Sequence, residues 1–207
     1  MTAIVNGMAA YGGLKPFGAT FFVFSDYCKP ALRLAALMGL PSMFVFSHDS
    51  FYVGEDGPTH EPIEQIESLR TMPNVDVYRP ADANETGACL ALMLMRDDGP
   101  SCILTTRQNL PVLADATPEK VMRSGYVLLA EGPQDERTVL FVATGSEVHL
   151  CVAEAGVAKG LMEFAVAPAT TRYLSLEHFG ASGPCARLAD EFGFTPANCL
   201  RLARELL

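Results

Sequence analysis

The residues best suited to acid–base chemistry stand together in one loop, between Ser47 and His60. Its fourteen residues, S-H-D-S-F-Y-V-G-E-D-G-P-T-H, hold two His, two Asp and one Glu. A histidine can move a proton near neutral pH, and an aspartate beside it can hold a hydroxyl group or raise the histidine pKa. We therefore take His48, Asp56 and His60 as candidate groups of a small-molecule site. A solvated loop is the plainer alternative. Metal binding is a weaker one, because no helical H-x-x-x-H array is present.

Two other segments carry groups suited to an anion. Thr105-Thr106-Arg107-Gln108-Asn109 closes an apolar run, and the guanidinium of Arg107 can bind two oxygens of a phosphate or carboxylate at once. An ion pair with a neighbouring acid explains Arg107 equally well. Gly145-Ser146-Glu147 resembles the turn before a helix N-terminus, which is a weaker sign of an anion site.

Three aromatic side chains, those of Phe21, Phe24 and Tyr27, recur every three residues. Together they could form a stacking pocket for a flat heterocycle. Spacing alone favours ordinary core packing over such a pocket.

The elements around these residues alternate between strands and helices, which is typical of a parallel, doubly wound α/β sheet. In such a sheet ligands bind at the carboxyl ends of the strands. We therefore expect residues 1–113 to place Phe24, His48, His60 and Arg107 along one cleft. The strands are expected at 20–24, 42–47, 75–78 and 101–105, and the helices at 2–13, 30–38, 62–71 and 82–95.

The alternation weakens after Pro111, where turn-rich segments predict a domain boundary. We assign residues 1–118 to a first domain, 119–136 to a linker and 137–207 to a smaller α/β domain. The expected elements of the second domain are strands at 138–143 and 172–175, a weak strand at 151–153, and helices at 184–192 and 196–206.

Composition limits the class of protein. The chain has 207 residues, of which 49% are apolar and 19% charged, so a well-packed core is expected. A net charge of −9 disfavours a nucleic-acid partner. Six scattered Cys form no C-x-x-C pair, so we expect reduced thiols in a cytoplasmic protein. Neither a signal peptide nor a membrane span is expected.

At these same residues the chain resembles the transketolase family. The resemblance extends over nearly the whole chain, and its motifs are long and occur in order. They are F-V-F-S-D-Y at 22–27, R-L-A-A-L-M-G-L-P at 33–41, G-E-D-G-P-T-H at 54–60, R-P-A-D-A-N-E-T at 79–86, T-R-Q-N-L-P-V-L at 106–113, A-T-G-S-E-V at 143–148 and F-G-A-S-G-P at 179–184.

The resemblance implies a ketol transferase of the pentose phosphate pathway, which uses thiamine diphosphate to move a two-carbon unit between sugar phosphates. It implies that residues 1–118 are a pyrimidine-binding domain of the thiamine-diphosphate-binding fold. By similarity, Phe21, Phe24 and Tyr27 line the aminopyrimidine pocket. His60 faces the reacting carbonyl and Asp56 holds the C2 hydroxyl. His48 and Arg107 bind the substrate phosphate.

The chain also departs from the family pattern. The glutamate that activates the aminopyrimidine would lie just before Met1, and the diphosphate-binding domain, which holds Mg²⁺ in the family, has no counterpart. A second gap is expected after Val148. We therefore expect the chain alone to lack activity and to form a homodimer or bind a partner chain that carries the missing domain. A non-catalytic remnant or dimerisation module, and one subunit of a split transketolase with a mis-set start, are the alternatives.

Overall fold

A parallel sheet forms the centre of the molecule. The computed structural model describes residues 1–122, 125–128, 141–155, 172 and 174–206. Within them a four-stranded sheet has the order β1-β2-β4-β3, and every pair is parallel. The strands are β1 (Phe17–Phe21), β2 (Met43–Ser47), β3 (Asp76–Tyr78) and β4 (Ser101–Thr105). This confirms the predicted α/β class.

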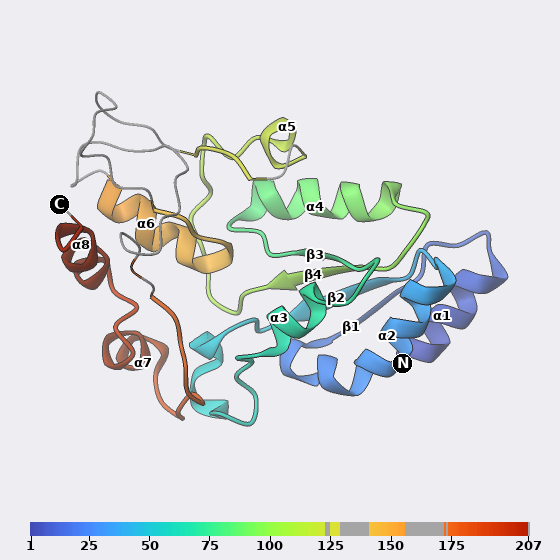
Figure 1. Cartoon of the computed structure of the whole chain (residues 1–207), viewed down its shortest axis with the longest axis horizontal. Helices are drawn as coiled ribbons and strands as arrows, with labels where there is room; N and C mark the ends of the chain where they lie inside the picture. Colours follow the sequence, from blue (N-terminus) through green and yellow to red (C-terminus); the bar gives the residue numbers. More distant parts are fainter. Residues whose placement is uncertain (123–124, 129–140, 156–171, 173, 207) are drawn as a thin grey trace.

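The two central strands bury residues on both faces, as parallel strands do when helices cover both sides. On one face Phe44, Phe46 and Leu104 pack in a core cluster with residues of α1, α2 and α3. On the other face Met43 and Ile103 pack against α4. Figure 1 shows the helices on either side of the sheet. The α-helices are α1 (Thr2–Tyr11), α2 (Ser25–Met38), α3 (Gln65–Arg70), α4 (Ala83–Met95), α5 (Pro118–Val121), α6 (Val148–Ala155), α7 (Cys185–Glu191) and α8 (Pro196–Arg204).

The ends of two helices have a local chemical cause. Asp82 caps α4, because its side chain accepts a hydrogen bond from the Glu85 N–H at 2.8 Å. α1 ends at Gly12, whose φ of 86° suits glycine.

Three boundaries in the first half differ from the sequence prediction. The first strand covers 17–21 rather than 20–24, because Phe22–Phe24 turns into the short 3₁₀ helix η1. α2 then begins at Ser25, so Pro30 lies inside the helix rather than at its start. α3 begins at Gln65, three residues after Pro62, so the expected start of this helix at residue 62 is also wrong.

The described part of the C-terminal region contains helices. The expected helices at 184–192 and 196–206 are confirmed as α7 and α8. The weak strand at 151–153 is wrong, because these residues belong to α6, which packs against α8. Two other strands are expected, at 138–143 and 172–175. Residues 138–140 and Tyr173 lie outside the described residues, and the described residues of both ranges are not in a strand.

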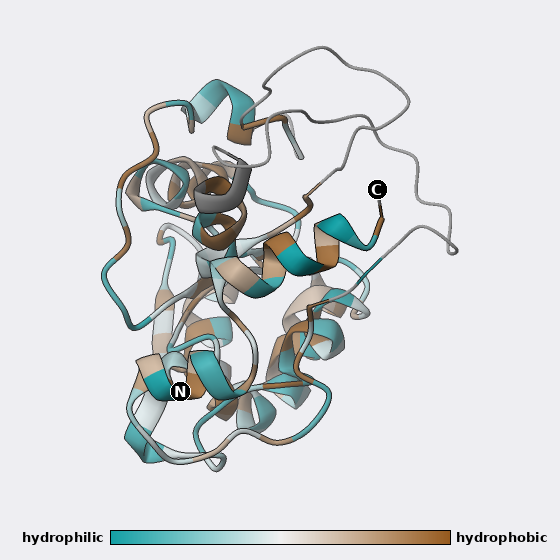
Figure 2. Cartoon of the chain, turned by 90° about the vertical axis from the view of Figure 1, so that its left-hand side faces the viewer, coloured by the Kyte–Doolittle hydropathy of each residue, from teal (hydrophilic) through white to brown (hydrophobic). Residues whose placement is uncertain are grey.

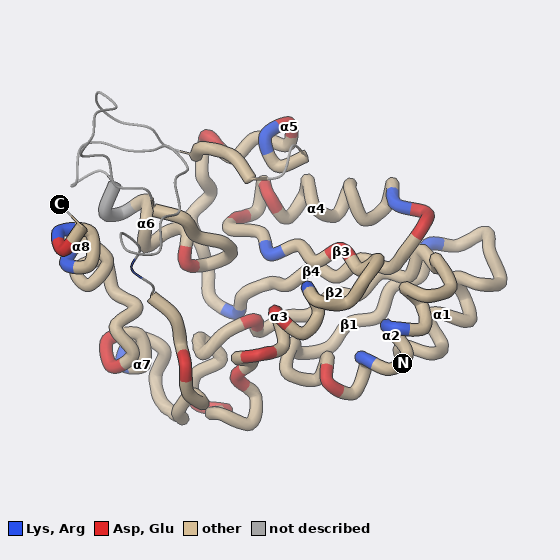
Figure 3. Tube along the Cα trace, viewed as in Figure 1, with Lys and Arg blue, Asp and Glu red and all other residues tan. Residues whose placement is uncertain are grey.

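The C-terminal helices lie at the carboxyl ends of the strands (Figure 1). α8 has a hydrophilic and a hydrophobic side (Figure 2), with Cys199 and Ala203 buried and Arg201 exposed. Acidic residues gather along the segment between β2 and α3, whereas basic residues are spread over separate elements (Figure 3). Among the described helices, none has the length and apolarity to cross a bilayer.

Candidate functional site

A chain of ring contacts joins five of the predicted site residues. The ring of Phe21 stacks on His48, with centroids 3.8 Å apart, and lies 6.4 Å from the ring of Phe24. Phe24 in turn contacts Tyr27 at 6.1 Å and meets the His60 ring edge-on at 5.5 Å. The aromatic triplet and the two histidines therefore form one cluster.

The sheet places this cluster. β1 ends at Phe21, and the buried Phe22 anchors the turn that carries Phe24. β2 pairs with β1 in parallel and ends at Ser47, so His48 comes out at the same edge. His48 has a φ of 61°, a backbone conformation uncommon outside glycine, and its Nδ1 lies 3.0 Å from Ser47 Oγ.

Two more predicted residues, Arg107 and Asp56, affect the pKa of His48. Burial lowers the His48 pKa, and the positive charge of Arg107 lowers it further, while Asp56 and Asp49 oppose the shift. Arg107 and Asp56 therefore lie within electrostatic reach of this imidazole.

The other predicted residues are more open. Asp56 and Arg107 are exposed, and Tyr27, at the outer end of the ring contacts, has 84% of its surface exposed. His60 is half-buried, and its Nδ1 lies 2.9 Å from Thr59 Oγ1. The structure thus gathers all seven predicted residues at the carboxyl edge of the sheet, with Tyr27 on the periphery.

Glu61 is a notable residue that sequence reasoning missed. It follows His60 directly, yet only 2% of its surface is exposed, and neither carboxyl oxygen has a hydrogen-bond partner that meets normal geometry. Burial raises its pKa to about 7, and the backbone of Ala181 partly offsets this effect. A glutamate beside a polar loop gives no sequence signal of burial, because the residues that cover it lie 120 positions away.

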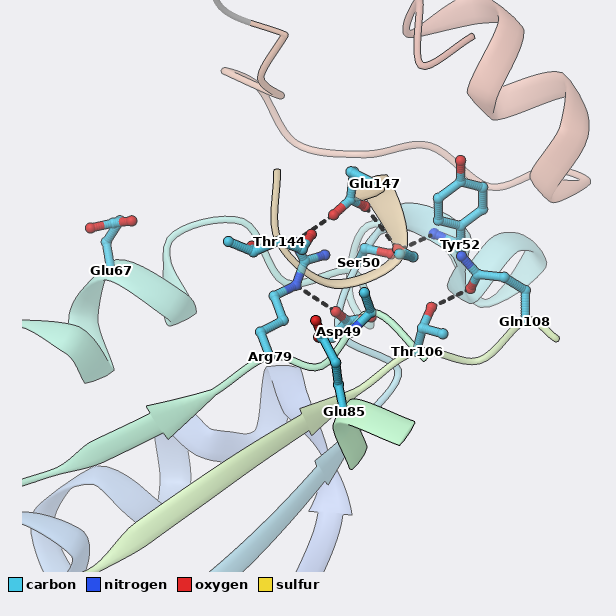
Figure 4. A network of polar contacts seen from close by, with 12 residues as sticks. Asp49, Ser50, Tyr52, Glu67, Arg79, Glu85, Thr106, Gln108, Thr144 and Glu147 are labelled. Atoms are coloured by element: carbon cyan, nitrogen blue, oxygen red, sulfur yellow. Dashed lines mark hydrogen bonds and ion pairs between the residues drawn. The ribbon is translucent and has the colours of Figure 1, made fainter. Parts of the chain in front are cut away.

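Arg79 at the end of β3 was also missed. Its Nε donates to Asp49 Oδ2 at 2.6 Å, and its Nη1 donates to the Thr144 carbonyl at 3.0 Å and pairs with Glu147 at 2.5 Å. Figure 4 shows this network. Burial opposes the charge on Arg79, but Asp49 and Glu147 outweigh it and raise its pKa. Arg79, like Arg107, follows the end of a strand, and this position could have marked it as a site candidate.

The loop that carries Arg107 is fixed at its far end by the start of α4. The Leu113 N–H donates to Asp82 Oδ2 at 2.7 Å, and Asn84 Nδ2 donates to the Leu113 carbonyl at 3.2 Å. Within the loop, Thr106 and Gln108 are hydrogen-bonded through their side chains (Figure 4). Two residues of the motif at 79–86 thus hold the end of the loop that carries Arg107, the candidate anion-binding residue.

A cavity of about 680 Å³ lies beside the ring cluster rather than within it. Its lining includes Asp49, Arg79 and Glu147, together with apolar residues of α3, α6 and α8. None of the seven predicted residues lines it. We favour the ring cluster as the site, because that cluster unites the ionisable groups with the exposed aromatic faces.

The cluster fits a flat heterocycle better than it fits a metal ion. Phe21 and Phe24 are partly exposed at the edge of the sheet, where an aromatic ring could stack on them. Within the part of the chain that is described, no group of three or more His, Cys, Asp or Glu is arranged to hold a metal ion.

Comparisons of the sequence and of the structure with known proteins agree on one family. The family model described as "Transketolase, pyrimidine binding domain" matches residues 1–112. The transketolase of Geobacillus stearothermophilus is 43% identical over 253 residues, and that of Bacillus subtilis (strain 168) is 39% identical; each match covers all of this chain and 38% of the relative. The chain therefore spans well under half of these relatives. The matched region is also longer than the chain itself, so the relatives carry residues there that this chain lacks.

Solved structures give the same result. Transketolase from Leishmania mexicana superposes with a TM-score of 0.90 at 32% identity, covering 99% of this chain and 36% of that one. A protein described as "Split gene transketolase, inactive beta4 tetramer" has a TM-score of 0.74 at 17% identity, which is a likeness of fold.

Proposed function

Because the chain belongs to the transketolase family, we propose that its ring cluster is the sugar-phosphate-facing half of a ketol-transfer site. The observation that carries the proposal is the meeting of Phe21 with His48 and of Phe24 with His60 at the carboxyl edge of the sheet. Stacking surfaces and acid–base groups are thereby within reach of one small molecule.

Each predicted residue has a role in this proposal. Phe21, Phe24 and Tyr27 hold the aminopyrimidine half of thiamine diphosphate, which supplies the carrier for the two-carbon unit when bound. His60 exchanges a proton with the reacting carbonyl or hydroxyl, and Asp56 accepts a hydrogen bond from the C2 hydroxyl.

His48 and Arg107 bind the phosphate of the substrate. Support comes from the lowering of the His48 pKa by Arg107, because a dianion bound beside both groups would offset the repulsion between the imidazolium and the guanidinium.

The division of labour along the chain is part of the proposal. Residues 1–118 form the pyrimidine-binding domain, 119–136 the linker and 137–207 a shortened C-terminal domain. The match covers 38% of the relatives' length. In this proposal the diphosphate group and Mg²⁺ are held by a region that corresponds to the unmatched part of the relatives. The thiols of Cys28, Cys89, Cys102 and Cys185 are not in disulfides, which supports a reducing compartment such as the cytoplasm.

Ligand binding tests the proposal directly. Ribose 5-phosphate and xylulose 5-phosphate are titrated into the chain while the ring resonances of His48 and His60 are followed by NMR. We expect both rings to shift with millimolar affinity, of the order of −4 kcal/mol. Ribose without phosphate serves as the control ligand and should bind more weakly. Unmoved histidine resonances at saturating sugar phosphate would contradict the proposal.

Turnover is measured separately, with both sugar phosphates, thiamine diphosphate and Mg²⁺. We expect no ketol transfer above background from these 207 residues alone. Robust turnover that His60→Ala abolishes would contradict this expectation.

A second candidate function, an association module, is favoured by one surface. The outward side of α1 presents Ile4 and Tyr11, which are 69% and 92% exposed. The adjacent helix α2 presents Leu34, Leu37 and Met38. Exposed apolar side chains on two helices that pack together could form an interaction surface.

Sedimentation velocity tests this candidate. We expect self-association of the wild-type chain and its loss in the double variant Ile4→Glu, Leu37→Glu. The matched control is Leu90→Glu, Leu94→Glu on the exposed side of α4. A monomeric wild type at high concentration would rule out the association surface.

A further inference from the structure

The segment Gly180–Cys185, which leads into α7, lies along the loop that carries Asp56 and His60. We call this segment the strap. The two are far apart in sequence, but α7 packs on the 3₁₀ helix η2 (Phe51–Asp56). Phe51 and Leu188 are both buried in the core cluster between them. The strap is thus anchored next to the loop by apolar packing.

Donors of the strap form hydrogen bonds with backbone carbonyl groups of the loop. Ser182 Oγ donates to the Glu55 carbonyl at 2.5 Å, and Cys185 Sγ donates to the Tyr52 carbonyl at 3.0 Å. A weaker bond runs from the Gly183 N–H to the Gly54 carbonyl at 3.5 Å. The Glu55 carbonyl belongs to the peptide unit that joins Glu55 to Asp56, so the Ser182 bond fixes the backbone at a predicted site residue.

Glycines on the loop make this close approach possible. Gly54 and Gly57 have φ values of 85° and 75°, so other residues would be strained there. A Cβ at Gly57 would lie 3.1 Å from Ser182 Cβ, and one at Gly54 would lie 3.0 Å from Cys185 Sγ. The glycines of the G-E-D-G sequence therefore leave the space that the strap fills.

The strap also covers the residue after His60. A Cβ at Gly180 would overlap Glu61 Oε2, and the Ala181 backbone lies against the same carboxyl group. Glu61 is buried as a result. Strap contacts thus reach both ends of the 55–61 stretch, at Glu55 and at Glu61.

We propose that the strap sets the position of Asp56 and His60, with Ser182 and Gly180 as positioning residues for the site. The proposal rests on the proposed function, because it assigns the strap a part in holding groups that act on the sugar. The strap touches neither the aromatic rings nor the histidines in the contacts above, so its effect passes through the loop backbone.

The test compares strap variants of the full chain by amide hydrogen exchange and histidine NMR. In Ser182→Ala we expect the amides within 54–60, apart from Pro58, which has no amide hydrogen, to exchange about fivefold faster, since one hydrogen bond of ordinary strength is lost. The His60 ring resonances should move as well. Ser182→Thr keeps the hydroxyl group and should show the amide exchange and the His60 resonances of the wild type. Gly180→Ala should have the larger effect, because its methyl group would overlap Glu61 Oε2, so either the buried carboxyl group or the strap must move.

Matched controls lie outside the strap. Ser175→Ala removes another exposed hydroxyl of the C-terminal region, one that donates to Glu177. Gly87→Ala adds a methyl group where no atom lies within 4 Å. Both should leave amides 54–60 and His60 unchanged. Since Ser182 is exposed, its substitution is not expected to prevent folding.

Two hydrogen-exchange results would overturn the proposal: loop exchange that Ser182→Ala leaves unchanged, or exchange that rises equally throughout the chain. Ribose 5-phosphate titration separates this proposal from the function it rests on. If the wild type binds no sugar phosphate, the proposed function fails. The exchange and His60 data then still show whether the strap positions the loop. If the wild type binds and Ser182→Ala loosens the loop without changing the affinity, the positioning role is refuted.

Discussion

The ring of Phe21 lies 3.8 Å from the imidazole of His48, centroid to centroid, which joins the last residue of β1 to the first residue after β2. Parallel pairing of these strands brings both residues to the same edge of the sheet. Phe21 also contacts Phe24, which contacts His60. The stack therefore connects the expected phosphate end of the site with its expected proton-transfer end.

Removing the Phe21 ring should raise the pKa of His48. Burial is the main cause that lowers this pKa, and Phe21→Ala opens one face of the imidazole to water. We expect the pKa to return toward 6.5, the ordinary value, in an NMR titration. Phe17→Ala, an exposed position on the same strand, is the control. An unchanged pKa in Phe21→Ala would show that the stack does not shield His48.

Substituting Arg107 should have two opposite effects. In Arg107→Gln the pKa of His48 should rise, because a positive charge that disfavours the imidazolium is gone. The affinity for ribose 5-phosphate should nevertheless fall by about tenfold or more, the value of a charge-assisted hydrogen bond. NMR measures the pKa in a pH titration and the affinity in a separate titration with ribose 5-phosphate. The control is Arg33→Gln, on an exposed part of α2. Unweakened phosphate binding would remove Arg107 from the site.

Glu61 should make stability depend on pH. Its pKa is about 7 in the folded chain against an ordinary value of 4.5, so the folded state keeps a proton that the unfolded chain releases. The contribution of Glu61 to the free energy of unfolding is complete below pH 4.5 and is lost as pH rises through 7. The loss is at most about 3 kcal/mol for a shift of this size.

Urea denaturation at pH 5 and pH 8 measures this effect. We expect wild type to lose stability over this range relative to Glu61→Gln, which cannot ionise. Glu67→Gln, on the exposed side of α3, should follow the wild-type curve. Identical pH profiles for wild type and Glu61→Gln would contradict the assignment.

Arg79 should be among the most sensitive positions for stability. Arg79→Met leaves the buried Asp49 and the half-buried Glu147 without their cation, and breaking a buried ion pair costs about 3–5 kcal/mol. Denaturant unfolding gives the value. Arg70→Met removes an exposed pair whose atoms are 3.9 Å apart and should cost less than about 1 kcal/mol. Equal costs for the two variants would show that the network adds no stability.

Local sequence was sufficient where one chemical signal dominates. The apolar runs of β2 and β4 are typical of buried strands in a covered sheet, and Asp82 can cap α4 through its own side chain. The boundaries of β1 and α2 were missed because Phe22 and Phe24 suit a strand as well as a turn. Their conformation is decided by the packing of Phe22 against Phe46, which no local pattern contains.

The sequence by itself determined the parallel α/β class, the edge of the sheet where the candidate residues meet, and the family. These follow from apolar periodicity and from ordered motifs that are read along the chain. Only the tertiary structure decided that residues 151–153 are helical, that Arg79 links Asp49 to Glu147, and that Gly180 covers Glu61. The reason is physical: burial and ion pairing depend on which distant segments pack together, and the strap lies more than 100 residues from the loop that it holds.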